Sequence, residues 1–102
     1  MADKIFRVNM TDLTTSVQAV PAAWAGYGGR GLTSTIVAAE VEPTCHPLGP
    51  KNKLVLAPGL LSGTVAANSG RLSIGAKSPL TGTIKESNAG GTAAQLLARA
   101  GC

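Results

Sequence analysis

The residues best suited to ligand chemistry lie between positions 69 and 91, SGRLSIGAKSPLTGTIKESNAGG. Two glycine-bearing turns, at 69–70 and 88–91, are predicted at its ends, and three cations lie between them: Arg71, Lys77 and Lys85. Small residues let a backbone approach a ligand closely, and unpaired amides with fixed cations suit a negative charge. The segment therefore predicts the binding of an anionic ligand.

Arg71 is the strongest single candidate, because its guanidinium offers paired donors to a phosphate and it directly follows Gly70. The same spacing fits an ordinary solvated arginine at a strand end equally well. Lys77 and Ser78 either contact an anion or form a plain turn before Pro79. The turn at 88–91 either presents its backbone to a ligand or cation, or serves only as a left-handed entry to a helix.

Residues 26–31, GYGGRG, match the G-x-G-x-x-G pattern of dinucleotide sites. No strand is predicted before them, and no acidic residue follows at a spacing of about 20 positions. We interpret them as a glycine loop before a helix, with Arg30 near the helix start. Such a loop can still place amides against an anionic group.

Other reactive side chains do not form a reaction centre in the sequence. Cys45 and His46 are neighbours in a proline-flanked loop and are interpreted as surface residues, and Cys102 is too distant for a short metal-binding motif. The five acidic residues form no general acid/base pair, and Glu40 and Glu42 are expected to face water. No run of cysteines suits an iron–sulfur cluster.

Length and composition set the class of protein. The chain has 102 residues, of which 44% are hydrophobic but only three are aromatic, so one small domain with a core of small side chains is expected. The net charge of +4 comes from scattered cations, which argues against nucleic acid. With no bilayer-length apolar run and no signal peptide, we expect a soluble cytoplasmic protein without a membrane partner.

The pattern of residues predicts an α+β fold in which a mixed sheet carries two main helices. Strands are expected at 4–10 and 16–20 as a hairpin, at 53–57 as a buried strand, and at 71–76 and 83–85. Helical segments are expected at 21–24, at 34–41 with Thr33 or Ser34 as N-cap, and at 93–100 between Thr92 and Gly101. Residues 42–53 are expected to form a loop. Because a helix after short strands usually leads to another strand, residues 1–102 are predicted to be one incomplete domain.

Five segments stand in an order that resembles one family: KIFRVNMTD, GGRGL (28–32), EVEPTCHPLGPKNKLVLAPGLLSGT, SGRLSIGAKSPLTG (69–82) and SNAGG (87–91). Together they are similar to the N-terminal part of the tungsten-containing aldehyde ferredoxin oxidoreductases, and the resemblance covers essentially the whole chain. It implies a partial N-terminal tungstopterin-binding domain whose sheets form a platform for cofactor.

The resemblance also implies an activity and its cofactors. Members of the family oxidise aldehydes to carboxylic acids and pass electrons through a [4Fe–4S] cluster to ferredoxin. Two pterins hold the tungsten, or molybdenum, and Mg²⁺ bridges the pterin phosphates. By resemblance Arg71 contacts a pterin, Gly90 lies on the pterin, and the backbone carbonyl of Asn88 binds Mg²⁺. Further cofactor contacts are implied in the KSPLTG and GGRG segments: Lys77, Ser78 and Arg30.

The cluster cysteines, the second pterin-binding segment and the substrate pocket of that family have no counterpart in these residues. The chain is therefore expected to be inactive alone and to need downstream domains or a catalytic partner chain. A fragment, a truncated reading frame and a separate small subunit all fit this expectation. The alternative is a binding or assembly module that self-associates or docks on a larger chain.

Overall fold

The computed structural model describes residues 4–24 and 26–102. The elements in chain order are β1 (Lys4–Asn9), β2 (Thr14–Ala19), η1 (Ala22–Trp24), α1 (Gly29–Glu40), β3 (Val55–Pro58), β4 (Arg71–Lys77), β5 (Ile84–Gly90) and α2 (Ala93–Arg99). The strands form a β1-β2 hairpin and a three-stranded sheet of order β3-β4-β5. The α+β class with two main helices is confirmed. Every pair among the described strands is antiparallel, so the parallel pairing of a mixed sheet is not found there.

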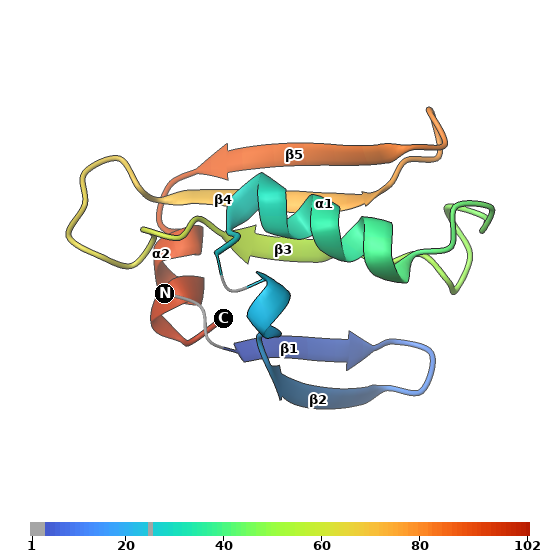
Figure 1. Cartoon of the computed structure of the whole chain (residues 1–102), viewed down its shortest axis with the longest axis horizontal. Helices are drawn as coiled ribbons and strands as arrows, with labels where there is room; N and C mark the ends of the chain where they lie inside the picture. The colour runs from blue at the N-terminus through green and yellow to red at the C-terminus, as the bar shows by residue number, and fades with distance from the viewer. Residues whose placement is uncertain (1–3, 25) are drawn as a thin grey trace.

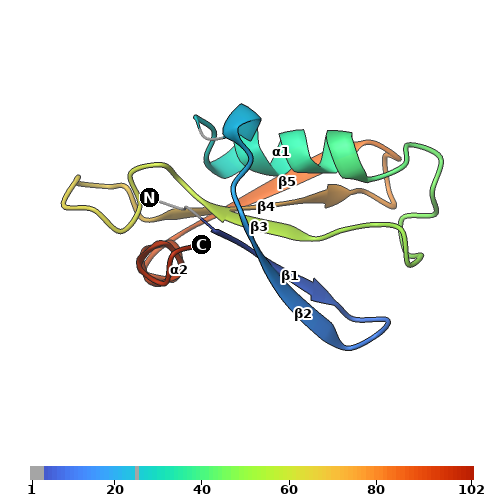
Figure 2. The ribbon, with the colours of Figure 1, turned by 60° about the horizontal axis from the view of Figure 1, so that its bottom comes forward.

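The two helices lie on opposite faces of the three-stranded sheet (Figures 1 and 2). In Figure 2, α1 lies above the sheet along β4, while α2 is seen end-on below it, at the end where β4 begins. The β1-β2 hairpin projects away from the sheet on the side opposite α1. This arrangement leaves the N-terminus of α1 over the sheet end at which β4 starts and β5 stops.

Close packing fixes α1 on the sheet. A side chain at Gly75 would bring its Cβ within 2.8 Å of the Cβ of Thr33, which is fully buried. Beside this contact, Leu32 and Ile36 of α1 form a small core cluster with Ala57 of β3. The core is built from small pieces, as the composition predicts, and its contacts place the first turn of α1 directly over β4.

The predicted start of α1 was wrong. The helix begins at Gly29, five residues earlier than expected, and neither Thr33 nor Ser34 caps it. Thr33 instead donates its hydroxyl to the Arg30 carbonyl inside the helix, at 3.1 Å. Gly28 occupies the N-cap position, and no side chain there accepts a hydrogen bond from the first turn.

Two strand predictions also need correction. The segment at 53–57 was expected to be buried, yet β3 is buried only in part: Ala57 is 2% exposed, whereas Leu56, which points to the opposite face, is 49% exposed. The turn expected at 88–91 is strand as far as Gly90, because β5 continues and Asn88 pairs with Ser73 of β4.

The other predicted elements are confirmed, with ends shifted by one to two residues. They comprise the hairpin, the short helical turn before Trp24, the loop at 42–53, the strand that begins at Arg71 and the final helix. Gly101 has φ +94° and ends α2 through bonds from its own N–H to Ala98 and from the Cys102 N–H to Leu97. Among the described residues, no helix has the length and apolar character needed to cross a membrane.

An ion-pair network holds the hairpin to the body of the protein. Arg7 donates from both terminal nitrogens to the two carboxylate oxygens of Glu40, at 2.7 and 2.8 Å, and Lys53 donates to the same carboxylate at 2.6 Å. The expectation that Glu40 faces water was therefore wrong. The bond from Arg7, reinforced by Lys53, lowers the pKa of Glu40 from 4.5 to about 2 despite the opposing effect of burial.

Candidate functional site

A polar network joins β4 and β5 at the end of the sheet below the N-terminus of α1. Arg71 donates from Nε to Oδ1 of Asn88 at 2.7 Å, and Asn88 donates from Nδ2 to the hydroxyl of Ser73 at 3.0 Å. Arg71 is exposed, whereas Ser73 is buried. The side-chain amide of Asn88 therefore fixes the orientation of Arg71, while the guanidinium of Arg71 remains accessible to solvent.

Because Gly90 has no side chain, the Arg71 side chain can extend across β5. The two residues are cross-strand partners, and a Cβ on Gly90 would lie 2.5 Å from Nη1 of Arg71. The guanidinium thus occupies the place that a side chain at position 90 would take. The predicted turn at 69–70 precedes this arrangement, with the Arg71 N–H bonded to the Ser69 carbonyl at 3.0 Å.

The backbone carbonyl of Asn88 points toward the free edge of β5. Bonds from Gly91 N–H to the Gly70 carbonyl and from Ser78 N–H to the Thr83 carbonyl mark the two ends of the β4-β5 ladder. In an antiparallel pair, hydrogen-bonded positions alternate with positions whose N–H and C=O point outward. Asn88 falls on an outward position by this alternation, and β5 is an edge strand.

The first turn of α1 lies against the same network. A Cβ on Gly29 would lie 3.4 Å from the hydroxyl oxygen of Ser73. The N–H groups of a helix start carry a partial positive charge, and no side chain at Gly28 satisfies them. One corner of the protein therefore contains Arg71, the Asn88 carbonyl and this helix end. The guanidinium and the helix end both offer hydrogen-bond donors to an anion.

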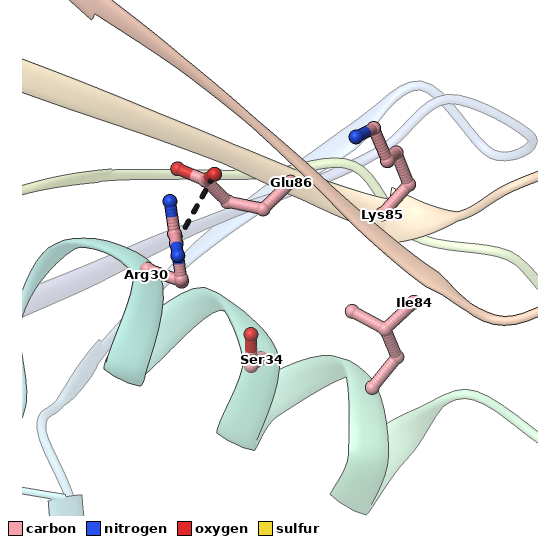
Figure 3. A pocket seen from close by; sticks show the side chains of 5 residues that line it. All are labelled: Arg30, Ser34, Ile84, Lys85 and Glu86. Carbon is pink, nitrogen blue, oxygen red and sulfur yellow. Dashed lines mark ion pairs between the residues drawn. The ribbon is translucent and has the colours of Figure 1, made fainter.

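Arg30 extends from the same turn toward β5. Its Nε lies 3.2 Å from Oε2 of Glu86, and the two residues line an open hollow of about 400 Å³ with Ser34, Ile84 and Lys85 (Figure 3). Figure 3 shows the Lys85 ammonium directed away from the Arg30–Glu86 pair. Sequence reasoning placed Arg30 near the ligand segment but missed both Glu86 and Ser73. The strand alternation could have found them, since both share a face with Asn88.

Lys77 and Ser78 lie at the opposite end of β4 from Arg71. The Lys77 ammonium donates to the backbone carbonyls of Pro43 and Cys45, at 2.5 and 2.6 Å. The structure therefore joins Lys77 to the loop at 42–53 and does not bring it together with Arg71 and Asn88.

In the part of the chain that the structure describes, no acid/base or metal constellation accompanies the polar corner. Nδ1 of His46 accepts the N–H of Leu48 at 3.1 Å. The interpretation of Cys45 as a surface residue was wrong, because it is buried in a core cluster with Val37 and Val41. Within residues 4–24 and 26–102, no group of three or more His, Cys, Asp or Glu side chains is placed to hold a metal ion. The arrangement can bind and orient an anionic ligand, and it offers one backbone oxygen to a cation.

Comparisons with known proteins agree with the sequence resemblance. A family model described as "Aldehyde ferredoxin oxidoreductase, N-terminal domain" matches residues 5–102. The tungsten-containing aldehyde ferredoxin oxidoreductase of Pyrococcus furiosus is 40% identical over 90 residues, which is 86% of this chain and 15% of that protein. The same enzyme of Thermococcus kodakarensis is 47% identical over 64 residues, covering 63% of this chain and 11% of that protein.

A solved structure shares the fold. It is described as the active site complex BamBC of benzoyl coenzyme A reductase with 1,5-dienoyl-CoA, and it matches with a TM-score of 0.91 and 32% sequence identity. The match covers 97% of this chain and 16% of that chain. The present chain thus spans about 15% of the length of the curated relative from Pyrococcus furiosus.

Proposed function

Because the chain belongs to the aldehyde ferredoxin oxidoreductase family, in its N-terminal domain, we propose that it forms one wall of a tungstopterin site. The corner made by Arg71, Asn88, Gly90 and the first turn of α1 is the cofactor-binding surface. The observation that carries this proposal is the bond from Arg71 to Asn88, which fixes an exposed guanidinium beside an outward-facing carbonyl.

The residues present fit phosphate groups of a pterin cofactor. Among the described residues the side chain of Arg71 is bonded only through Nε, so its terminal nitrogens can donate as a pair to phosphate oxygens. The uncapped helix start provides backbone N–H groups. Gly90 keeps the guanidinium close to the strand, where a larger residue would displace it. Arg30 adds a second cation on the same helix turn. Lys77 and Ser78 support no such role, because they lie at the other end of β4.

A magnesium ion would also fit this corner. Mg²⁺ takes oxygen ligands and is usually held by few protein groups together with phosphates and waters. The outward carbonyl of Asn88 supplies one such oxygen, while its side-chain amide is already bonded to Arg71 and Ser73. Asn88 therefore has separate roles for its backbone and its side chain.

When bound, the tungsten (or molybdenum) centre would supply the two-electron oxidation of an aldehyde to a carboxylic acid, with electrons passing through a [4Fe–4S] cluster to ferredoxin. The residues described here bind and orient phosphate groups and provide no acid, base or cluster ligand for that reaction. We therefore propose that this chain acts with further polypeptide of the family and is inactive alone. The predicted cytoplasmic location is part of the same proposal.

Co-expression with a downstream portion of a family member, in a host supplied with tungstate, tests this function. Pterin measured by mass spectrometry and tungsten by elemental analysis are expected in the co-purified complex but not in the isolated chain, whose single wall binds phosphate groups only reversibly. The variant Arg71→Ala is expected to lower both contents several-fold, and Lys51→Ala, which removes an exposed cation from the loop at 42–53, serves as the control. Full cofactor occupancy with Arg71→Ala would remove this corner from the site.

A second candidate function, a self-associating assembly module, is favoured by the hairpin surface. Phe6 and Val17 are cross-strand partners that are 47% and 58% exposed, and Val8 beside them is 62% exposed. A two-stranded ribbon with an uncovered apolar face is marginally stable alone. Light scattering of the purified chain distinguishes the two: a stable oligomer supports the assembly module, and a monomer at all concentrations rejects it.

A further inference from the structure

Glu86 is an incompletely paired carboxylate next to the proposed cofactor-binding surface of Arg71, Asn88, Gly90 and the first turn of α1 (the phosphate wall). Its side chain is only 12% exposed, and its Oε1 is buried with no hydrogen-bond partner among the described residues. Its Oε2 faces Arg30, whose side chain is 74% exposed. Burying a charged oxygen without a donor costs free energy, so such an atom calls for an explanation.

The charge of the wall is small for the ligand proposed. Glu86 offsets the positive charge of Arg30, and Arg71 is bonded to a neutral amide, so the three ionised side chains carry a net charge of +1. Each phosphate monoester carries about −1.5 to −2 at pH 7. One net positive charge leaves most of the charge of two phosphates uncompensated.

We propose that Glu86 makes this wall selective for phosphate groups complexed with a divalent cation, against the same phosphates without the cation. The inference rests on the proposed function and deepens it by naming a specificity residue. Glu86 and Asn88 are two positions apart on β5 and share a face, so their Cα atoms lie about 7 Å from each other.

The selectivity follows from the sign of the charge. The Glu86 carboxylate, two positions from Asn88 on the same strand, repels a bare anion and attracts a cation bound at the Asn88 carbonyl. Burial strengthens both effects, because charges in a partly buried site are screened less than those at the surface. Glu86 acts through the electrostatic potential of its carboxylate and through its ion pair with Arg30. The divalent cation supplies the positive charge that the protein side chains do not provide.

Calorimetric titration of the chain with inorganic pyrophosphate, in Mg²⁺ and in EDTA, measures this selectivity. The wild type is expected to bind pyrophosphate at least about tenfold more tightly with Mg²⁺. Glu86→Gln is expected to reduce that ratio by roughly tenfold, because it tightens the binding of metal-free pyrophosphate. Glu86→Asp keeps the charge and is expected to retain most of the ratio.

Glu42→Gln is the matched control, since it removes the same charge from a carboxylate that is 57% exposed and paired with Lys51. Its ratio is expected to equal that of the wild type. A thermal unfolding curve for each variant establishes that the folded proteins are being compared. The ratio itself would not respond to a merely structural role of the Arg30–Glu86 pair.

The outcomes separate this inference from the function on which it rests. If Arg71→Ala abolishes binding and Glu86→Gln leaves the ratio unchanged, the Glu86 inference is overturned and the phosphate wall stands. If binding is insensitive to Arg71→Ala, or magnesium pyrophosphate does not bind the wild type, both fail. A reduced ratio for Glu86→Gln, with Glu42→Gln unchanged, supports the inference.

Discussion

Arg71 and Asn88 are joined across two strands by a 2.7 Å bond between a guanidinium nitrogen and an amide oxygen. The bond links residues 17 positions apart in the sequence and fixes the orientation of an otherwise exposed cation. Asn88 is itself anchored by Ser73, so the orientation of Arg71 depends on a buried hydroxyl of the central strand. The two residues define the proposed phosphate wall.

Removing the Asn88 amide tests whether this orientation matters. Asn88→Ala keeps the backbone carbonyl but loses the bonds to Arg71 and Ser73. A single hydrogen bond to a charged group contributes about 1.5–3 kcal/mol, so we expect affinity for magnesium pyrophosphate to fall by roughly tenfold or more. Magnesium dependence should remain, because the carbonyl is retained. Unchanged affinity would show that Arg71 needs no support from Asn88.

Adding one methyl group at position 90 tests the path of Arg71. Gly90→Ala places a Cβ within 2.5 Å of Nη1 of Arg71, and the flexible guanidinium is expected to move aside. Pyrophosphate affinity should therefore fall several-fold while thermal stability changes little. Gly26→Ala, whose Cβ also meets nothing within 4 Å and which lies before the first turn of α1, is the control and should keep full affinity. Equal affinities for the two variants would contradict the proposed geometry.

The contact between α1 and β4 predicts a stability effect at Gly75. A Cβ there meets Thr33, which is fully buried and cannot swing into solvent. We expect Gly75→Ala to destabilise the protein by about 1–3 kcal/mol, as overpacking of a dense core does. Urea unfolding followed by circular dichroism measures the loss. A variant as stable as the wild type would mean that α1 does not pack this closely on β4.

The Glu40 network predicts a dependence of stability on pH. The folded-state pKa of Glu40 is lowered from 4.5 to about 2, so its contribution is fully present above pH 4.5 and is lost as pH falls toward 2. This shift corresponds to at most about 3 kcal/mol, with partial exposure of Arg7 and Lys53 reducing it. Glu40→Gln should unfold more easily at pH 7 and lose less stability on acidification. If Glu40→Gln and the wild type lost the same amount of stability on acidification, this prediction would be contradicted.

Local patterns predicted the hairpin, β4 and α2, because alternation and capping residues lie within a few positions of each other. They failed where a distant partner decided the outcome. The SNAGG segment looked like a turn, but pairing with Ser73 extends β5 through Asn88. Thr33 looked like a helix cap, but its burial against Gly75 places it inside α1.

The candidate site shows the same division between local and distant information. Arg71 and Asn88 were predicted from residue types and family resemblance, and the structure brings them together. Lys77 was a weaker candidate than Arg71 in sequence, and its ammonium bonds carbonyls of a loop more than 30 positions away. The partner of Glu40 is 33 positions away in β1, so no local pattern could have indicated it.

The position of the phosphate wall is tested most directly by nuclear magnetic resonance of the ¹⁵N-labelled chain titrated with magnesium pyrophosphate. We predict that the largest shift changes fall at Arg71, Asn88, Gly90 and the first turn of α1, and that Arg71→Ala abolishes them. Shift changes centred on Lys77, Ser78 and the loop at 42–53, with the Arg71 corner unaffected, would contradict the account.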